Sequence, residues 1–285
     1  MKFVALVGLI DEADVIGACI DYHLSIGFDH IMITDLGSRD GSLEIVRERM
    51  DATGRVSLLH ATSDMRKLDW PARMLETAIR DLAPDYVAYI DPDEFWIPRS
   101  GSIRTLKDVG SADVLSVKRY NAVQNVEHLS QRRHIDRHEF LYEVVFTERK
   151  PVSMASPPMT AIYSGPIGPK VMHSAVDVTI GTGGHAVKSE QLTRQVTPED
   201  VIILHYPISS YANFEQKIRN AAETIALNPH YPETMAWHWR RMVAALQDGS
   251  LPQEYRAQVF SGTEIQDMVQ ANKAAPLWSI LSARA

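Results

Sequence analysis

The stretch from 86 to 96, YVAYIDPDEFW, ends an apolar run in three carboxylates, Asp91, Asp93 and Glu94. The run is short and rich in β-branched and aromatic side chains, which is typical of a buried strand. Acids at the carboxyl end of such a strand lie where open α/β sheets bind ligands. Carboxylates this close repel one another unless they share a cation, and an Asp-x-Asp pair suits Mg²⁺ or Mn²⁺ held together with substrate phosphates. The spacing predicts a divalent-metal site, and an acidic turn after a core strand is the alternative.

The composition is that of an ordinary globular protein. The chain is 45% hydrophobic and 23% charged, and its 285 residues suffice for one large α/β domain or for one domain with a small appendage. A net charge of -7 argues against a nucleic-acid binder, and the single Cys19 excludes a disulfide framework. No apolar run approaches the ~20 residues of a membrane span. The apolar start of the chain is followed at once by acids, so we interpret 3–10 as a strand rather than as a short signal peptide. We expect a cytoplasmic protein, with peripheral contact with the inner face of the membrane left open.

Strand and helix patterns alternate along the first hundred residues. The strand patterns cover 3–10, 30–34, 56–60 and 87–90, and the helical patterns cover 13–26, 41–50 and 70–82. This alternation indicates βαβ units. It predicts an α/β fold with a mainly parallel sheet flanked by helices.

The second half is organised differently. Strand patterns at 114–118, 142–147 and 201–204 surround a loop over 155–170 that is punctuated by proline and glycine. Helical patterns follow at 209–226, 233–246 and 263–272, which predict a C-terminal helical region on or beside the sheet. Trp237 and Trp239 are expected to pack this region on the core, and an interfacial membrane contact is the alternative.

Polar residues also follow the first two strands. Asp11 and Glu12 come after the first strand, and the segment from Asp35 to Asp40 comes after the second. The small residues of this segment permit close backbone approach, and Asp35 and Asp40 are candidates to accept hydrogen bonds from a base or ribose. Asp40 before Gly41 is also ordinary helix-capping chemistry, so both interpretations stay open for it.

Together these motifs resemble family 2-type glycosyltransferases with the GT-A fold. More narrowly, I-D-P-D-E-F-W resembles the D-x-D-E-F branch that carries a later H-Y-x-x-x-S element, the group that includes family 92-like enzymes. Here that element is His205-Tyr-Pro-Ile-Ser-Ser210, followed by Phe214 and Lys217. The resemblance covers roughly residues 1–220, which would form the nucleotide-sugar-binding and catalytic domain, with 221–285 as a helical extension.

The resemblance implies a Rossmann-type GT-A-like sheet and a nucleoside diphosphate sugar as donor. Asp11 and Glu12 would lie near the nucleoside and Asp35 near the base or ribose. Asp91 and Asp93 would hold Mn²⁺ or Mg²⁺ across the two phosphates, which would neutralise the leaving diphosphate. Asp93 is favoured for direct coordination, and Asp91 for contact through water or the ribose. Uridine is the expected base, because the acids after the first two strands can accept the uracil N–H. Guanosine stays open as the alternative.

Three residues of the second half are candidates for further contacts. His205 ends an apolar strand and is a candidate metal ligand, since a neutral imidazole suits Mn²⁺ beside carboxylates. His185 follows two glycines and is a candidate donor-loop contact. Lys170 closes the proline- and glycine-rich loop and could reach a phosphate as a point charge. For each of them a structural or solvated role is the alternative.

The acceptor side is less defined. The narrower resemblance implies inversion, for which a carboxylate must take the acceptor proton; Glu94, Glu127 and Asp136 are candidates, and Glu94 could instead brace the site. The basic segment 131–138 would suit an anionic acceptor, such as a phosphorylated lipid carrier or an acidic saccharide, but a solvated loop is the favoured interpretation. The expected acceptor is a saccharide or a lipid-linked group.

The chain departs from the family pattern at two strand ends. Asp11 stands where the first-strand pair usually begins with Asn, and Leu36 stands where Asn usually follows the Asp.

Two other functions are alternatives to glycosyl transfer. A sugar nucleotidyltransferase would carry a Gly-rich basic phosphate loop near the first strand, which this chain lacks. A non-catalytic saccharide- or nucleotide-binding protein on the same fold is the other rival, and the intact acid pair argues against it.

Overall fold

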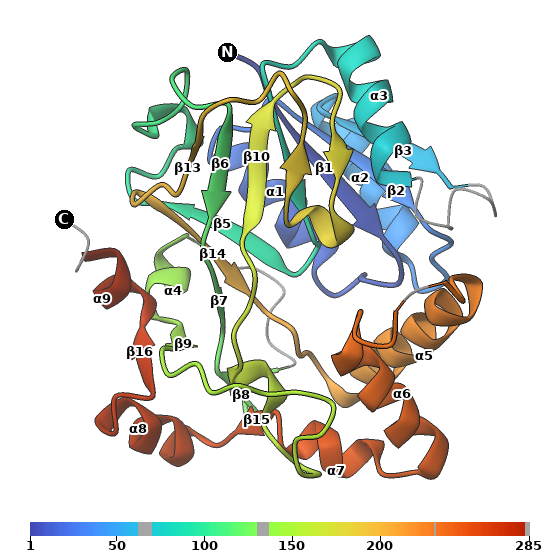
Figure 1. The fold of residues 1–285 in the computed structure, drawn as a ribbon, viewed down its shortest axis with the longest axis vertical. Helices are drawn as coiled ribbons and strands as arrows, with labels where there is room; N and C mark the ends of the chain where they lie inside the picture. Colours follow the sequence, from blue (N-terminus) through green and yellow to red (C-terminus); the bar gives the residue numbers. More distant parts are fainter. Residues whose placement is uncertain (62–69, 130–136, 231, 283–285) are drawn as a thin grey trace.

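The computed structural model describes residues 1–61, 70–129, 137–230 and 232–282, which form a central sheet flanked by helices (Figure 1). The first half contains β1 (Phe3–Leu9), α1 (Ile16–Ser25), β2 (His30–Asp35), α2 (Ser42–Thr53), β3 (Val56–His60), α3 (Trp70–Leu82) and β4 (Tyr86–Ile90). Each of these strands lies within one residue of its expected ends. The expected alternation of strand and helix is confirmed.

The main sheet has seven strands in the order β13-β6-β10-β4-β1-β2-β3. The second half supplies β6 (Val114–Val117), β10 (Lys170–Ser174) and β13 (Gln195–Val196). The strands β4, β1, β2 and β3 are parallel, β13 is parallel to β6, and only β10 runs antiparallel to its neighbours. A mainly parallel sheet is therefore confirmed. The sequence pattern did not predict β10, because this strand directly follows the proline- and glycine-rich loop.

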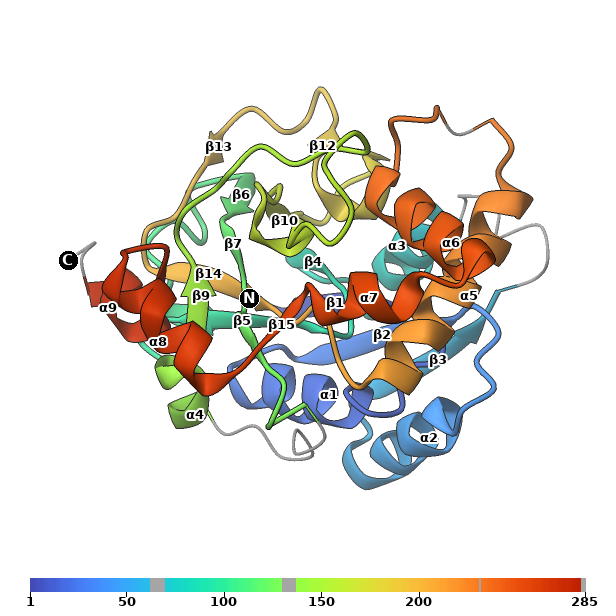
Figure 2. The ribbon, with the colours of Figure 1, turned by 90° about the horizontal axis from the view of Figure 1, so that it is seen from below.

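The two faces of the sheet are covered by different helices. Along β1, Phe3, Ala5 and Val7 pack with residues of α1 and α2, whereas Val4 and Leu6 pack with residues of α3. This alternation follows from the period of two along a strand. Figure 2 shows α1 and α2 on one side of the sheet and α3 on the other. With both faces buried, the carboxyl ends of the strands are where polar side chains can gather.

A second, three-stranded sheet connects the end of the main sheet to the rest of the chain. It has the order β5 (Glu94–Pro98), β14 (Val201–His205) and β7 (Arg119–Asn121). In β5 the side chains of Phe95, Trp96 and Ile97 are all fully buried. The sequence analysis expected β14 but neither β5 nor β7. Both have polar residues at their ends, and only pairing with β14 makes strands of them.

The remaining elements form the periphery. They are η1 (Ile103–Thr105), β8 (Gln124–Asn125), α4 (Arg137–Tyr142), β9 (Val144–Phe146), η2 (Ile162–Ser164), β11 (Thr179–Ile180), η3 (Thr182–Gly184) and β12 (Val187–Lys188). The C-terminal region comprises α5 (Tyr211–Leu227), α6 (Trp237–Asp248), α7 (Leu251–Arg256), β15 (Val259–Phe260), α8 (Gly262–Gln270), β16 (Ala274–Pro276) and α9 (Leu277–Ser282).

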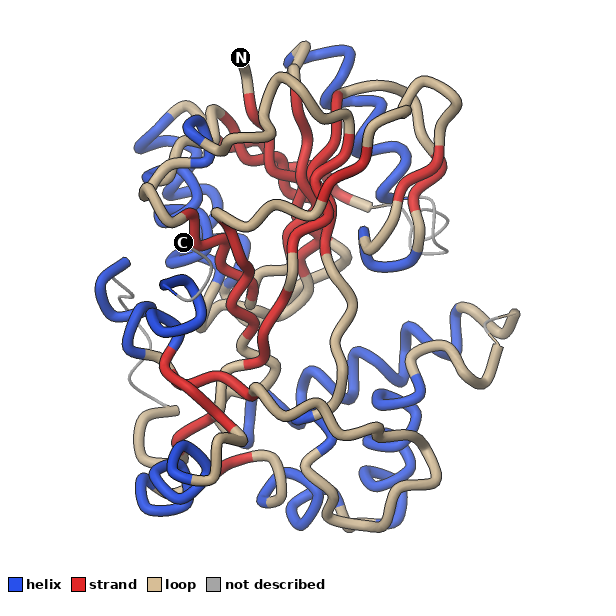
Figure 3. The backbone as a smooth tube through the Cα atoms, turned by 60° about the vertical axis from the view of Figure 1, so that its left-hand side comes forward, coloured by secondary structure: helices blue, strands red, loops and turns tan. Residues whose placement is uncertain are grey.

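The C-terminal helices have a small core of their own. Phe214 and Ile218 of α5 pack with Met242 of α6 and Leu251 of α7, and Trp237 packs against this cluster. Figure 3 shows these helices below the main sheet. The expected C-terminal helical region is confirmed. Residue 220, the expected domain boundary, lies inside α5.

None of the helices in the described ranges is long and apolar enough to cross a membrane. A cytoplasmic location and a peripheral membrane contact stay predictions of the sequence.

Matched leucines test how much the second sheet contributes to stability. Leu204 on β14 is fully buried, whereas Leu227 at the end of α5 is 37% exposed. Leu204→Ala is expected to lower the free energy of unfolding by about 2–5 kcal/mol, because it removes core contacts and leaves a cavity. Leu227→Ala is expected to change it by about 0.5 kcal/mol or less. Urea denaturation measures both, and equal losses would contradict a core role for β14.

Candidate functional site

The chain turns sharply between the two sheets at Asp91 and Asp93. The Glu94 N–H donates to the Asp91 carbonyl (3.0 Å), so β4 leads directly into β5. β5 pairs with β14 so that Glu94 lies opposite His205, and the Tyr206 N–H donates to the Asp93 carbonyl (2.9 Å). Two motifs more than a hundred residues apart in the sequence therefore meet at the carboxyl end of β4.

Asp93 lies between a lysine and a histidine. Its Oδ2 is 2.6 Å from the Lys217 Nζ of α5, and its Oδ1 is 3.6 Å from the His205 Nε2. Burial raises the pKa of Asp93, but Lys217 and His205 outweigh burial and hold it well below its usual range. Burial lowers the pKa of Lys217, but Asp93 and Glu12 outweigh burial and hold it well above its usual range. Both groups are therefore charged at neutral pH.

Glu12 shares the same lysine. Its Oε1 is 3.0 Å from the Lys217 Nζ, and its side chain is 15% exposed. Burial raises the pKa of Glu12 to about 8, although Lys217 acts in the opposite direction. Glu12 is thus the carboxyl of this cluster that holds a proton most readily.

Asp91 and Glu94 face a separate pair of cations. The Lys170 Nζ is 2.7 Å from Asp91 Oδ2 and 3.4 Å from Glu94 Oε2, and Arg119 forms an ion pair with Glu94 Oε1. Glu94 Oε2 also accepts the Asp91 N–H (3.1 Å). Burial raises the pKa of Asp91, but Lys170 outweighs burial and lowers it. Glu94 and Lys170 are fully buried. The geometry favours a bracing role for Glu94, and it places the Lys170 ammonium against carboxylates rather than at an open phosphate position.

The two candidate histidines are each anchored through Nδ1. His205 Nδ1 is 2.6 Å from the Asn121 Oδ1, and His185 Nδ1 is 2.7 Å from the Pro169 carbonyl. Burial, together with the cations Arg119 and Lys170, lowers the pKa of His185 to about 4, so it is neutral at pH 7. Its position near Asp91 agrees with the expected donor-loop contact and leaves that role a proposal.

The strand-end acids Asp11, Asp35 and Asp40 are also engaged. Asp11 Oδ2 accepts from the Asn220 amide of α5 (2.9 Å), and Asp35 Oδ1 accepts the Ser38 N–H (2.9 Å). Asp40 Oδ1 accepts the N–H of Ser42, the first residue of α2 (3.0 Å). The N-cap residue of α2 is Gly41, so Asp40 contacts the start of the helix from one residue before the cap, and its ligand-binding role stays a prediction. Asp11 and Glu12 both contact α5, so they dock the C-terminal region on the strand ends.

Glu127, another candidate base, lies outside this cluster. Glu127 is exposed in the turn after β8, where its N–H donates to the Asn125 Oδ1 (2.9 Å). Asp136 and most of the basic segment 131–138 lie outside the described residues.

Sequence reasoning did not identify three residues next to the site. Arg119 and Asn121 reach it from β7, a strand that the sequence did not reveal. His238 at the start of α6 has a pKa lowered to about 4 by burial and by the nearby charges of His205, Arg119 and Lys217. Its ring lies 6.5 Å from that of Tyr163. The only sequence signal for His238 was its place in the Trp-His-Trp cluster.

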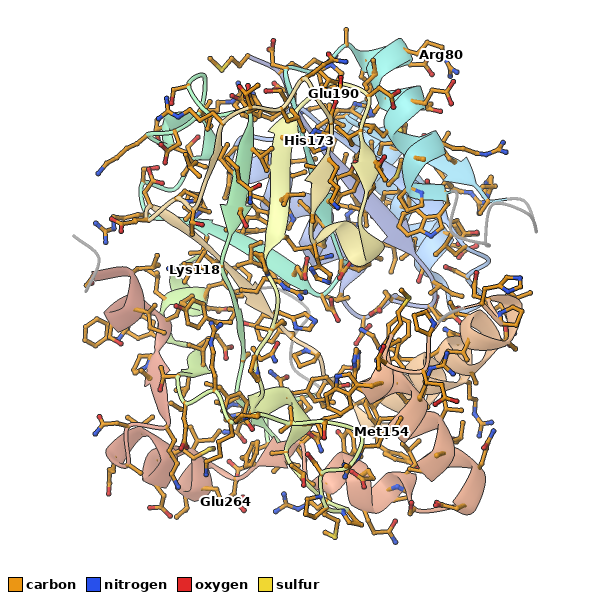
Figure 4. All side chains as sticks on the ribbon, in the orientation of Figure 1. Arg80, Lys118, Met154, His173, Glu190 and Glu264 are labelled. Atoms are coloured by element: carbon orange, nitrogen blue, oxygen red, sulfur yellow. The ribbon has the colours of Figure 1, made fainter. Side chains whose placement is uncertain are left out.

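Burial alone does not place a histidine in the site. His173 on β10 is fully buried, and burial lowers its pKa to about 4. Its Nδ1 is 2.7 Å from the Ser174 carbonyl, and its ring stacks with Tyr89. Figure 4 shows His173 near the upper end of the main sheet.

A large cavity opens beside the acids. Its volume is about 1080 Å³, and Glu12, Asp93 and Lys217 line one part of it. The rest of the described lining comes mainly from one face of α1 and from the segment 206–214 that leads into α5. The cavity is large enough to admit a sugar-sized molecule to the Asp93 carboxylate.

The side chains around Asp93 include two possible ligands of a divalent cation. Within the described ranges, no three His, Cys, Asp or Glu side chains are grouped closely enough to hold a metal ion. Asp93 Oδ1 and His205 Nε2 form a pair 3.6 Å apart. Two ligands each about 2.1 Å from one ion lie roughly 3–3.6 Å apart, and Mg²⁺ sites often combine one or two carboxylates with substrate phosphates. Asp93 and His205 therefore fit such an ion, whereas Asp91 is paired with Lys170.

No protein-family model matches this chain, and no curated protein matches it. Among solved structures, the chain is similar to S. aureus TarS 1-349 at 12% identity, over 95% of this chain and 92% of that chain, with a TM-score of 0.39. The mannosyltransferase PcManGT from Pyrobaculum calidifontis, in complex with GDP-Man and Mn²⁺, matches at 15% identity, over 99% and 85%, with a TM-score of 0.43.

A third similar structure is glucosyl-3-phosphoglycerate synthase from Mycobacterium tuberculosis, in complex with Mn²⁺, UDP and glucosyl-3-phosphoglycerate. It matches at 18% identity, over 42% of this chain and 44% of that chain, with a TM-score of 0.27. At these identities and TM-scores the likenesses assign no ligand, activity or residue role to this chain.

Variants of two glutamates test whether Glu94 has a structural role or acts as a catalytic base. Glu94→Gln is expected to lower the free energy of unfolding by about 3–5 kcal/mol, because it leaves the buried Arg119 without its charged partner and Lys170 with Asp91 alone. Glu127→Gln, at an exposed position, is expected to change it by about 0.5 kcal/mol or less. Chemical denaturation of both variants measures the difference. A fully stable Glu94→Gln protein that had lost only turnover would instead make Glu94 a catalytic base.

The pH dependence of stability tests the environment of Glu12. Its pKa in the folded protein, about 8, lies above the ordinary value of 4.5, so the folded chain binds more protons than the unfolded chain between these values. This group therefore lowers stability as the pH rises from about 4.5 to about 8. Glu12→Gln cannot ionise, so its free energy of unfolding should rise relative to wild type across that window. Denaturation curves at several pH values measure this, and a constant difference would contradict it.

Proposed function

We propose that this chain is a glycosyltransferase that moves a sugar from a nucleoside diphosphate sugar to a saccharide or lipid-linked acceptor. The observation that carries the proposal is the meeting of Asp93 and His205 at the carboxyl end of β4. These residues belong to two of the motifs on which the sequence resemblance to family 2-type and family 92-like enzymes rests. The catalytic domain would be 1–220, with 221–285 as the extension.

In this proposal Asp93 and His205 hold Mn²⁺ or Mg²⁺. The ion supplies Lewis-acid neutralisation of the diphosphate. Lys217 lies 2.6 Å from Asp93 and adds a second positive charge at the same place. Lys170 and Arg119 hold Asp91 and Glu94, so the turn that carries Asp93 is fixed before substrate binds.

The donor nucleoside would lie along the ends of β1 and β2. Asp35 is its proposed contact for the base or ribose, with Asp11 and Glu12 shaping the edge next to α5. His185 would contact the donor next to Asp91. Uridine stays the proposed base.

We propose inversion at the anomeric carbon. Glu127 and Asp136 stay the candidate bases, because Glu94 has both oxygens engaged with cations. The cavity of about 1080 Å³ that reaches Asp93 is the proposed route for the acceptor.

Nucleotide binding tests the metal and donor assignments together. At a ligand concentration of 100 times Kd, binding stabilises a protein by about 2.7 kcal/mol, which raises the Tm by roughly 5–10 °C for a chain of this size. UDP is expected to produce this shift only with Mn²⁺, in wild type and at least in part in Asp91→Asn. Asp93→Asn is expected to abolish it. Thermal denaturation with UDP, GDP, CDP and ADP, each with and without Mn²⁺, makes the measurement.

Product analysis separates this proposal from its rivals. Release of nucleoside diphosphate from a sugar donor supports glycosyl transfer, whereas release of pyrophosphate would indicate a nucleotidyltransferase. Metal-dependent nucleotide binding without turnover, across several acceptor classes, would favour a non-catalytic binding protein. A Tm that no nucleotide shifts would overturn the donor site itself.

A further inference from the structure

Asn121 contacts the His205 imidazole from the neighbouring strand. β7 and β14 are parallel, and their register places Asn121 directly beside His205. The Asn121 Oδ1 is 2.6 Å from His205 Nδ1, and the asparagine is only 5% exposed. It reaches neither the acids nor the cavity lining, so any part that it plays must act through His205.

The orientation of the Asn121 amide follows from its second contact. Its Nδ2 lies 2.7 Å from the Tyr163 carbonyl oxygen, which can only accept a hydrogen bond. The reversed amide would place two acceptors against each other. The Oδ1 must therefore face His205, and a carbonyl oxygen at 2.6 Å requires a proton on the Nδ1 of that ring.

When the His205 ring is neutral, this contact decides where its lone pair lies. A neutral imidazole protonated on Nδ1 carries its lone pair on Nε2. Nε2 is 3.6 Å from the Asp93 Oδ1, which is too long for a hydrogen bond. Two electron-pair donors thus face the same small space, an arrangement that a cation stabilises.

We propose that Asn121 is a positioning residue that fixes the tautomer and ring orientation of His205, so that the Nε2 lone pair is aimed at the space next to Asp93. The inference rests on the proposed function in one respect, the identity of the divalent ion. Histidine ligands of metals usually donate their other N–H to a carboxylate, a carbonyl or water. Here the acceptor is the amide oxygen of Asn121.

The loop that carries Tyr163 is itself tied to β7 and to the helical region. Arg119 on β7 donates from Nε to the Gly168 carbonyl (2.7 Å). The Tyr163 N–H donates to the Gln258 Oε1 (3.4 Å), and the Gln258 Nε2 donates to the Thr160 carbonyl (2.9 Å). The Tyr163 carbonyl is therefore held in place, and it holds the amide of Asn121 in turn.

Two measurements on one set of variants test this role. The first is the tautomer of His205 in the metal-free protein, read from ¹⁵N chemical shifts of labelled histidine and assigned with His205→Ala. The second is the Kd for Mn²⁺ alone, from the electron paramagnetic resonance of free Mn²⁺. Wild type should show the Nδ1–H tautomer. Asn121→Leu should lose this preference and bind Mn²⁺ about 10–100-fold more weakly.

Two further variants sharpen the result. Asn121→Asp keeps an accepting oxygen, so it should retain the Nδ1–H tautomer and much of the Mn²⁺ affinity. Asn228→Leu is the matched control, because Asn228 is also buried and its side-chain amide donates to the Thr224 carbonyl of α5. It should leave both measurements unchanged. If Asn121→Leu does not fold, Asn121→Ala carries the same test without added bulk.

The outcomes separate this inference from the proposed function. An Asn121→Leu protein with the wild-type tautomer and Kd would overturn the positioning role. Absence of Mn²⁺ binding by folded wild type would overturn the metal assignment. The tautomer of Asn121→Leu would still decide the role of Asn121 in that case.

Discussion

Electrostatic repulsion among the acids at the strand ends is the constraint on which the rest of the structure depends. Glu12, Asp91, Asp93 and Glu94 gather at the carboxyl ends of β1 and β4, and such a cluster is unfavourable in a poorly solvated place unless cations balance it. Three cations do so, and each comes from a different element of the second half: Arg119 from β7, Lys170 from β10 and Lys217 from α5. The second half of the chain therefore balances the charge of the first half.

The cations are distributed unevenly around Asp91, Asp93 and Glu94, so the three acids of this short motif have different environments. Glu94 is fully buried and is engaged by Arg119 and Lys170, so breaking its ion pairs would leave a buried charge without its partner, whereas the half-exposed Asp91 pairs with Lys170. Asp93 faces the other way, toward His205, Lys217 and the cavity. Its carboxylate is largely buried, is fixed by its neighbours and lines the cavity. This is the arrangement that preorganised electrostatic stabilisation requires.

The same polar contacts attach α5 to the sheet. Along one face of α5, Lys217 reaches Glu12 and Asp93, and Asn220 reaches Asp11. The apolar side of the helix, with Phe214 and Ile218, packs on α6 and α7 instead. The helical region is thus joined to the strand ends largely through charges and amides. Its docking is expected to respond to pH and salt more than the core of the main sheet does.

Much of the fold could be predicted from the sequence alone. The apolar periods located β1 to β4 within a residue, because strands buried on both faces read as short continuous apolar runs. The acids after β4 and the motif at His205 were likewise visible, because residue type and local spacing carry that signal. What could not be predicted were β5 and β7, whose polar ends hide them until β14 supplies a partner.

The partners of the acids were decided only by the tertiary structure. Nothing near Lys217 or Asn121 in the sequence indicates that one meets Asp93 and the other His205, since strand register and helix docking set those contacts over distances of more than 80 residues. The sequence by itself determined that an acidic, ligand-facing edge would form on a parallel sheet. The tertiary structure decided which acid is braced and which is left facing the cavity, because only packing brings charges from distant elements within a few ångströms of each other.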